Sequence, residues 1–221
     1  MKKTLVLVLL LMFSTTLLFA QAKHVGRMTT TTEKSAIHTP SQDEPAGLAK
    51  IYSNLGKKKT DVYLDSDGWT VNGPNASGFN GTYQWFGMPF TPKSNSHVSQ
   101  VQVAVEWVAG DNQVNLNLYT DSSGIPGTLI AGPVTVTNLG TFGTCCTLAV
   151  ADFPSTAVTG GTQYWVVANT TTSGTGSDSW DAWAFVPALY LQAFYNNNNG
   201  YWIGFDAATS EAAGAVYGTI P

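Results

Sequence analysis

The stretch that decides the fold lies between Val98 and Val108 and reads VSQVQVAVEWV. Large apolar side chains occupy every second position of its later part, at Val101, Val103, Val105 and Trp107. This period of two is typical of a β-strand with one buried and one polar face. Residues 109–112 carry turn chemistry, and residues 114–119 alternate in the same way. The two alternating stretches therefore predict a β-hairpin.

Short apolar or aromatic stretches bounded by Gly, Pro, Asn or Ser continue along the rest of the chain. They predict strands at residues 69–72, 83–90, 128–136, 147–151, 163–169, 180–186, 189–195, 201–205 and 215–220. No segment shows a convincing amphipathic helix, and no internal repeat is evident. Many short strands with close turns predict an all-β fold, an antiparallel β-sandwich with jelly-roll-like connections.

The beginning of the chain has the composition of a targeting segment. Residues 1–22 combine Lys2 and Lys3, an apolar run and the small-x-small sequence at residues 20–22, which predicts a signal peptide cleaved after Ala22 or Ala20. A retained membrane anchor is the alternative. Residues 23–47 are predicted to be a flexible polar spacer, and residues 48–221 a single β-sandwich domain. We expect a secreted protein, extracellular or periplasmic, with no membrane span after cleavage.

The distribution of charge restricts the possible partners. Charged residues make up only 11% of the 221 residues, and all ten Lys and Arg lie at or before Lys93. All charged residues of the segment 94–221 are acidic. The segment therefore offers no basic face for a nucleic acid and no Arg or Lys to bind a phosphate. The sequence therefore argues against nucleic acids, nucleotide cofactors and anionic membrane surfaces as partners.

Two motifs in the middle of the chain resemble a known family. Residues 118–129 read LYTDSSGIPGTL and residues 159–167 read TGGTQYWVV. A strand that ends in an Asp-Gly-x-Pro-Gly-like turn, followed by a Gly-Thr-x-Tyr-Trp strand, resembles the choice-of-anchor R domain family of exported bacterial proteins. The resemblance implies an extracellular β-sandwich of undefined biochemical role, often tethered by a separate sorting segment. It implies no catalytic residues.

Catalytic and metal-binding patterns are weak. His97 is the only histidine of the predicted domain, and no Gly-x-Ser-x-Gly elbow is present. Glu106 is the best single carboxylate for a glycosidase, on the predicted polar face, but no second acid is evident beside it. We predict no catalytic residues and no cofactor. Calcium is the alternative, because residues 65–68 and 178–181 each offer two carboxylates in predicted turns.

Aromatic residues provide the candidate ligand site. Sugar rings stack on aromatic faces, and amide or carboxylate groups bind their hydroxyls. The predicted ligand-binding residues are Trp180, Asp181, Trp183, Asn196, Asn197 and Trp202. If the strand at residues 180–186 is extended, Trp180 and Trp183 face opposite sides, so one of them should belong to the core.

The only cysteines, Cys145 and Cys146, are adjacent. An oxidising compartment favours a disulfide. Adjacent Cα atoms lie about 3.8 Å apart across a trans peptide bond, closer than in most disulfides. A vicinal disulfide would therefore strain the peptide; two buried reduced thiols and a bridge to another chain are the alternatives.

The sequence leaves three functions open. The first is a secreted, non-enzymatic protein with a cell-surface or extracellular interaction role. The second is a neutral carbohydrate-binding module, and the third is a glycan-active hydrolase. The expected partner is a neutral glycan or another surface component.

Overall fold

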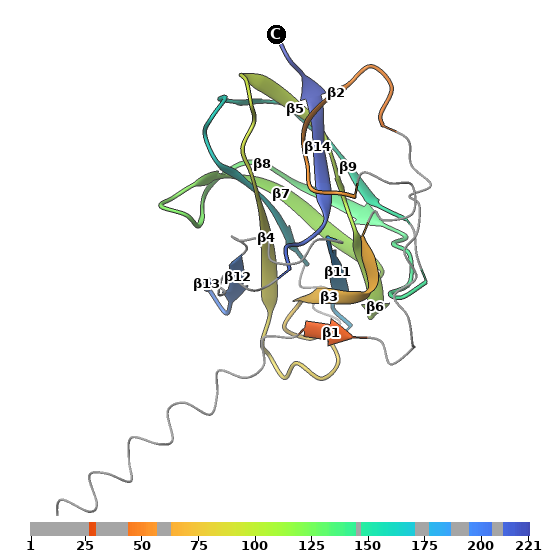
Figure 1. The fold of residues 1–221 in the computed structure, drawn as a ribbon. Helices are drawn as coiled ribbons and strands as arrows, with labels where there is room; N and C mark the ends of the chain where they lie inside the picture. The colour runs from red at the N-terminus through yellow and green to blue at the C-terminus, as the bar shows by residue number, and fades with distance from the viewer. Residues whose placement is uncertain are drawn as a thin grey trace, which may run out of the picture.

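The computed structural model describes residues 27–29, 44–56, 63–144, 147–170, 177–186, 195–204 and 210–221. These residues form two antiparallel sheets and no helix, which confirms the predicted all-β sandwich (Figure 1). The strands are β1 (Arg27–Thr29), β2 (Ala49–Ser53), β3 (Leu64–Asn72), β4 (Gln84–Phe90), β5 (Ser96–Val103), β6 (Val105–Ala109), β7 (Gln113–Asp121), β8 (Pro126–Thr137), β9 (Ala149–Val158), β10 (Tyr164–Asn169), β11 (Trp180–Phe185), β12 (Tyr195–Asn198), β13 (Tyr201–Gly204) and β14 (Gly214–Thr219).

The connections between the sheets are those of a jelly roll. The smaller sheet has the order β2-β14-β5-β9, and the larger sheet contains the order β4-β10-β7-β8. Along the chain, these strands alternate between the sheets as β2, β4, β5, β7 and then as β8, β9, β10, β14. This is the double Greek key expected of a jelly roll.

The larger sheet is extended beyond β4. The strands β3, β11 and β6 continue it on one side, and the β12–β13 hairpin pairs with β4. Figure 1 shows the hairpin beside β4 and β3, β11 and β6 on the other side of that strand. The turn of the hairpin has positive φ at Asn199 and Gly200, which is the conformation that an Asn-Gly turn favours.

The core lies between the two sheets. It includes Phe86, Met88, Val101, Val103, Leu116, Leu118, Val166 and Val216, all fully buried. The same alternation that buries these residues directs their neighbours on β4, β7 and β10 away from the smaller sheet. We call that surface the outer face of the larger sheet.

The predicted hairpin of residues 98–108 with residues 114–119 is wrong. The chain leaves the smaller sheet after Val103 and enters the larger one at Val105, so the predicted single strand is two strands. β6 pairs with β11, whereas β7 pairs with β10 and β8. The alternation of apolar and polar residues does not reveal this break. Ala104, which the alternation places on the polar face, is in fact buried, and its amide donates to the Ala213 carbonyl oxygen.

Other segments also differ from the expectation. Arg27–Thr29 lies within the predicted spacer but pairs with β3 as β1, and β2 was not predicted. Residues 65–68 belong to β3 rather than to a turn, and Asn196 and Asn197 belong to β12. Backbone pairing with neighbouring strands overrides the turn preference of Asp and Asn at these positions. Residues 1–22, Cys145 and Cys146 lie outside the described residues, so their predictions stay open.

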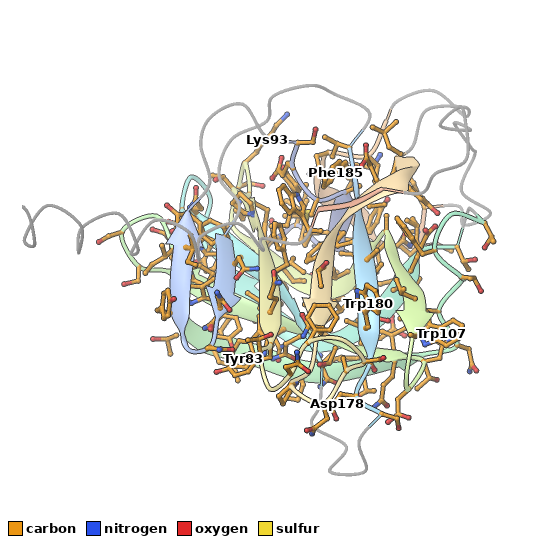
Figure 2. All side chains as sticks on the ribbon, turned by 90° about the horizontal axis from the view of Figure 1, so that it is seen from below. Tyr83, Lys93, Trp107, Asp178, Trp180 and Phe185 are labelled. Atoms are coloured by element: carbon orange, nitrogen blue, oxygen red, sulfur yellow. The ribbon has the colours of Figure 1, made fainter. Side chains whose placement is uncertain are left out.

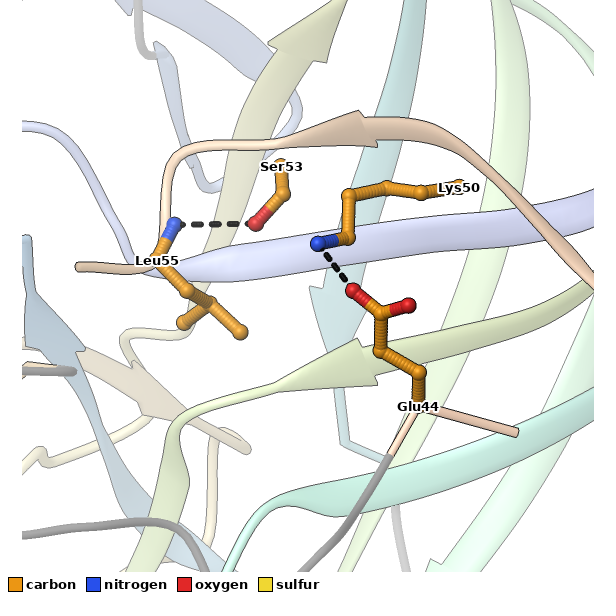
Figure 3. Close-up of polar contacts among 4 residues, drawn as sticks. All are labelled: Glu44, Lys50, Ser53 and Leu55. Carbon is orange, nitrogen blue, oxygen red and sulfur yellow. Dashed lines mark hydrogen bonds and ion pairs between the residues drawn. The ribbon is translucent and has the colours of Figure 1, made fainter. Parts of the chain in front are cut away.

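An ion pair lies on the surface at β2. Lys50 on β2 contacts the Glu44 carboxylate, and the Leu55 amide donates to Ser53 Oγ at 3.2 Å (Figure 3). The hydrogen bond to Glu44 is the main reason that the Lys50 pKa is raised. Both charged side chains are exposed, so this pair contributes little to the stability of the fold.

Among the described residues, no helix is long and apolar enough to cross a membrane.

Candidate functional site

The outer face of the larger sheet is hollowed into a groove of about 440 Å³. The strands β4, β7, β8 and β10 and the loop after β3 supply its walls. The lining residues are Gly73, Pro74, Tyr83, Trp85, Asn115, Asn117, Tyr119, Leu129, Pro133, Asn169 and Thr170. We call this the outer groove.

The floor of the outer groove consists of amide side chains. Asn115 on β7 accepts a hydrogen bond from Thr135 Oγ1 at 2.7 Å. Asn117 Nδ2 donates to the Val167 carbonyl oxygen at 3.3 Å and to Asn169 Oδ1 at 3.4 Å. These bonds and the burial of Asn115 and Asn117 hold the amides in fixed orientations. The floor is therefore polar and preorganised.

Aromatic and apolar side chains form the walls. Trp85 on β4 and Tyr83, just before this strand, are both partly buried, and their ring centroids lie 5.8 Å apart. Tyr119 and the exposed Leu129 lie on the opposite side, paired across β7 and β8. Burial raises the pKa of Tyr119, so its phenol stays neutral over the physiological range.

The outer groove contains no charge and retains unused hydrogen-bonding capacity. None of the lining residues is acidic or basic. Thr170 Oγ1 is buried and has no hydrogen-bond partner among the residues that the structure describes. A buried hydroxyl without a partner is costly, and a ligand hydroxyl or a bound water at this position would relieve that cost.

The structure separates the predicted ligand-binding residues into three places. Trp183 is fully buried in the core, where Nε1 donates to the Ala213 carbonyl oxygen at 2.9 Å. Asn196 is also buried and donates to Gln84 Oε1 at 2.5 Å. Asp181 is completely buried, neither of its oxygens has a hydrogen-bond partner within the described part of the chain, and burial raises its pKa well above the ordinary value. These three side chains offer no surface to a ligand.

Trp180, Asn197 and Trp202 are placed differently. Trp180 packs edge-on against Phe79, with ring centroids 5.2 Å apart. Figure 2 shows Trp180 at the β3–β11 side of the sheet and Tyr83 near the β12–β13 hairpin. Asn197 and Trp202 pair with each other on that hairpin, and Asn197 also pairs with Trp85. Of the predicted set, Asn197 and Trp202 are therefore the two that pair in line with Trp85 of the groove.

Glu106 does not lie on a solvated polar face, as the alternation suggested. Its side chain is buried, accepting from the Tyr63 hydroxyl at 3.2 Å and from the Gly143 amide at 3.0 Å. The change of sheets at Ala104 moves β6 away from β7, so Glu106 is not beside the asparagines of the groove floor. Its carboxylate has a structural role at this position.

At residues 178–181, one of the two proposed calcium sites, the two acids do not converge on one point. Asp178 Oδ2 accepts the Asn75 amide at 2.8 Å, whereas Asp181 points into the interior. Among the described residues, no three His, Cys, Asp or Glu side chains are grouped so that they could hold a metal ion.

Asp121 anchors the wall of the outer groove, a role that the sequence did not reveal. Its Oδ1 accepts from Trp165 Nε1 and from Gln163 Nε2, both at 2.8 Å, and its Oδ2 accepts the Gly124 amide at 3.0 Å. Burial alone would raise the pKa of Asp121, but the three hydrogen bonds outweigh it and lower the pKa below 3.8. Trp165 is thereby fixed beside Tyr119, its partner across β10 and β7.

An Asp121→Asn substitution is expected to cost about 1 to 2 kcal/mol of unfolding free energy at neutral pH, because a charged acceptor is lost. A lowered pKa stabilises the fold above the unfolded-state value and loses that effect as pH falls through the folded-state value. The difference from the wild type should therefore shrink in strong acid. Chemical denaturation at neutral and acidic pH measures it. The exposed Asp152→Asn serves as the control, and an equal loss in both variants would contradict the anchoring role.

No protein-family model matches this sequence, and no curated protein matches it either. The resemblance to the choice-of-anchor R family stays a prediction.

Proposed function

We propose that this protein is an exported, non-enzymatic β-sandwich that binds a neutral glycan in the outer groove. The observation that carries the proposal is the combination of an amide floor with aromatic walls and no charged lining residue. Apolar faces of sugar rings pack on aromatic side chains, and their hydroxyls exchange hydrogen bonds with amides. An interaction role at a cell surface or in a matrix follows naturally from such binding.

Binding fits the groove better than hydrolysis does. A glycosidase needs a pair of carboxyl groups on either side of the scissile bond. The lining residues include no carboxylate, and Glu106 and Asp181 are buried in the sandwich. Incubation with neutral polysaccharides should therefore release no new reducing ends, and their appearance would support the hydrolase instead.

A Trp85→Ala variant tests the proposed site. Loss of a stacking ring and of its buried apolar area should weaken binding of a neutral polysaccharide by about tenfold or more. Titration calorimetry on the purified protein, with soluble neutral polysaccharides as probes, measures this change. Tyr119→Ala, on the opposite wall, provides a second variant in case Trp85→Ala fails to fold.

Tyr201→Ala is the matched control. Tyr201 is an aromatic residue of β13 with 60% of its surface exposed, and it is not part of the groove lining. Its removal should leave affinity unchanged. Failure of the folded wild-type protein to bind any neutral glycan would refute the proposed function, as would unchanged affinity in both groove variants.

A further inference from the structure

The outer face carries two sets of paired residues, and the register of β10 with β4, which ends at Ala168 and Phe86, places the two sets in one row across the strands. On one side, Asn115 pairs with Thr135 of β8 and with Asn169 of β10. On the other side, Asn197 of β12 pairs with Trp85 of β4 and with Trp202 of β13. Residues that pair across neighbouring strands project from the same face of a sheet. Trp202 therefore belongs to the same row as Trp85, although it is not one of the residues that line the groove.

The register determines how far apart the two tryptophans of this row lie. Trp85 and Trp202 are both partners of Asn197, so they are separated by two strand spacings. With neighbouring strands about 4.8 Å apart, this separation is about 10 Å at the backbone. Asn197 lies between them as a short, buried side chain whose Oδ1 accepts the Gly200 amide at 2.7 Å. No bulky group of the row therefore stands between the two indoles.

A spacing of about 10 Å matches a particular kind of sugar chain. In an extended β-1,4-linked chain of hexoses, successive rings are turned over, so that the same ring face recurs at every second sugar, after about 10 Å, two strand spacings. Chains with α-1,4 or β-1,3 links curl, and they do not present one face at this interval along a straight line.

We infer that the ligand of the outer groove is a linear, neutral, β-1,4-linked glycan that runs across the strands, with alternate sugars stacked on Trp85 and Trp202. This inference rests on the proposed function and specifies its ligand class. The row from β8 to β13 crosses five strand spacings, about 24 Å, which corresponds to four or five sugars.

A series of oligosaccharides of increasing length tests the inference on the whole exported protein. Affinity for β-1,4-linked gluco- or manno-oligosaccharides should rise from the disaccharide to the tetra- or pentasaccharide and then level off. Laminari- and malto-oligosaccharides, with β-1,3 and α-1,4 links, should bind more weakly at equal length. Trp202→Ala should weaken the pentasaccharide about five- to tenfold and leave the disaccharide unchanged, because the shorter ligand remains in the groove.

Tyr201→Ala is again the control, since Tyr201 precedes Trp202 on β13 and projects from the other face. Equal binding of curled and extended chains, affinity independent of length, or no effect of Trp202→Ala on the pentasaccharide would each overturn the inference while the proposed function stands. Absence of binding to every neutral oligosaccharide and polysaccharide would overturn both.

Discussion

A Trp183→Ala protein is expected to lose about 3 to 5 kcal/mol of unfolding free energy, the usual cost of removing a buried aromatic side chain. Trp183 is completely buried, and its ring packs edge-on against Phe86 with centroids 6.3 Å apart. The substitution would also leave the Ala213 carbonyl oxygen without the indole donor. Denaturant unfolding followed by circular dichroism measures the loss.

Trp202→Ala provides the comparison for Trp183. Both tryptophans are candidate ligand contacts from the sequence, but Trp202 lies on the β12–β13 hairpin and is only partly buried. Its replacement should cost less than about 1 kcal/mol of stability. The two variants should therefore differ in their effects: Trp183→Ala should lower the stability of the fold, and Trp202→Ala should lower the affinity for the ligand. Comparable stability of the two would contradict the core position of Trp183.

The stability of the protein is expected to fall as pH rises from about 4.5 to about 8. Glu211, just before β14, is nearly buried, and this burial raises the pKa of its carboxyl from 4.5 to about 8, even though the nearby Asn54 side chain lowers it. The folded protein therefore holds a proton that the unfolded chain releases across this interval. A raised pKa means that the stabilising effect is complete below pH 4.5 and is lost as pH passes through about 8.

The expected loss from Glu211 is on the order of 4 kcal/mol between these limits. Asp181 has a raised pKa for the same reason and contributes in the same direction. Glu211→Gln should match the wild type at pH 4.5 and exceed its stability at pH 8, because the amide cannot ionise. Asp181→Asn, alone and in the double variant, separates the contribution of the second carboxyl.

Thermal unfolding at several pH values between 4.5 and 8 measures these effects. Glu44→Gln is the matched control, because it also replaces a carboxyl by an amide, but at an exposed position. A wild-type melting temperature that does not vary over this range would contradict the prediction. So would a Glu211→Gln protein whose stability falls as steeply as that of the wild type.

The strands that the sequence predicted correctly were recognisable from local patterns. Alternation within residues 114–119 appears as β7, and the aromatic stretch at residues 163–169 appears as β10. Local alternation buries one side of a strand whichever partner it has, so it predicts a strand without predicting its neighbours. Ala104 illustrates the limit, because a small buried residue hides the point at which the chain changes sheets.

The candidate site depended far more on the tertiary structure. Among the residues of the groove, Trp85 and Asn169 lie more than 80 positions apart in the chain, and only their positions on the adjacent strands β4 and β10 bring them together. Asn115, Asn117 and Tyr119 appeared in the sequence simply as the polar side of a strand. The signal that could have drawn attention to them is the succession of amides on one face, but amides are also common on solvated sheet faces.

The sequence by itself determined the all-β class, most of the strands and the lack of positive charge after Lys93, because each of these is a local or compositional property. Only the tertiary structure decided that Trp183 and Asp181 are interior, that Glu106 is enclosed, and that Trp202 is in line with Trp85. The physical reason is that strand pairing in a jelly roll is non-local. Burial and neighbourhood are set by strands far away in the sequence, whose order no local pattern encodes.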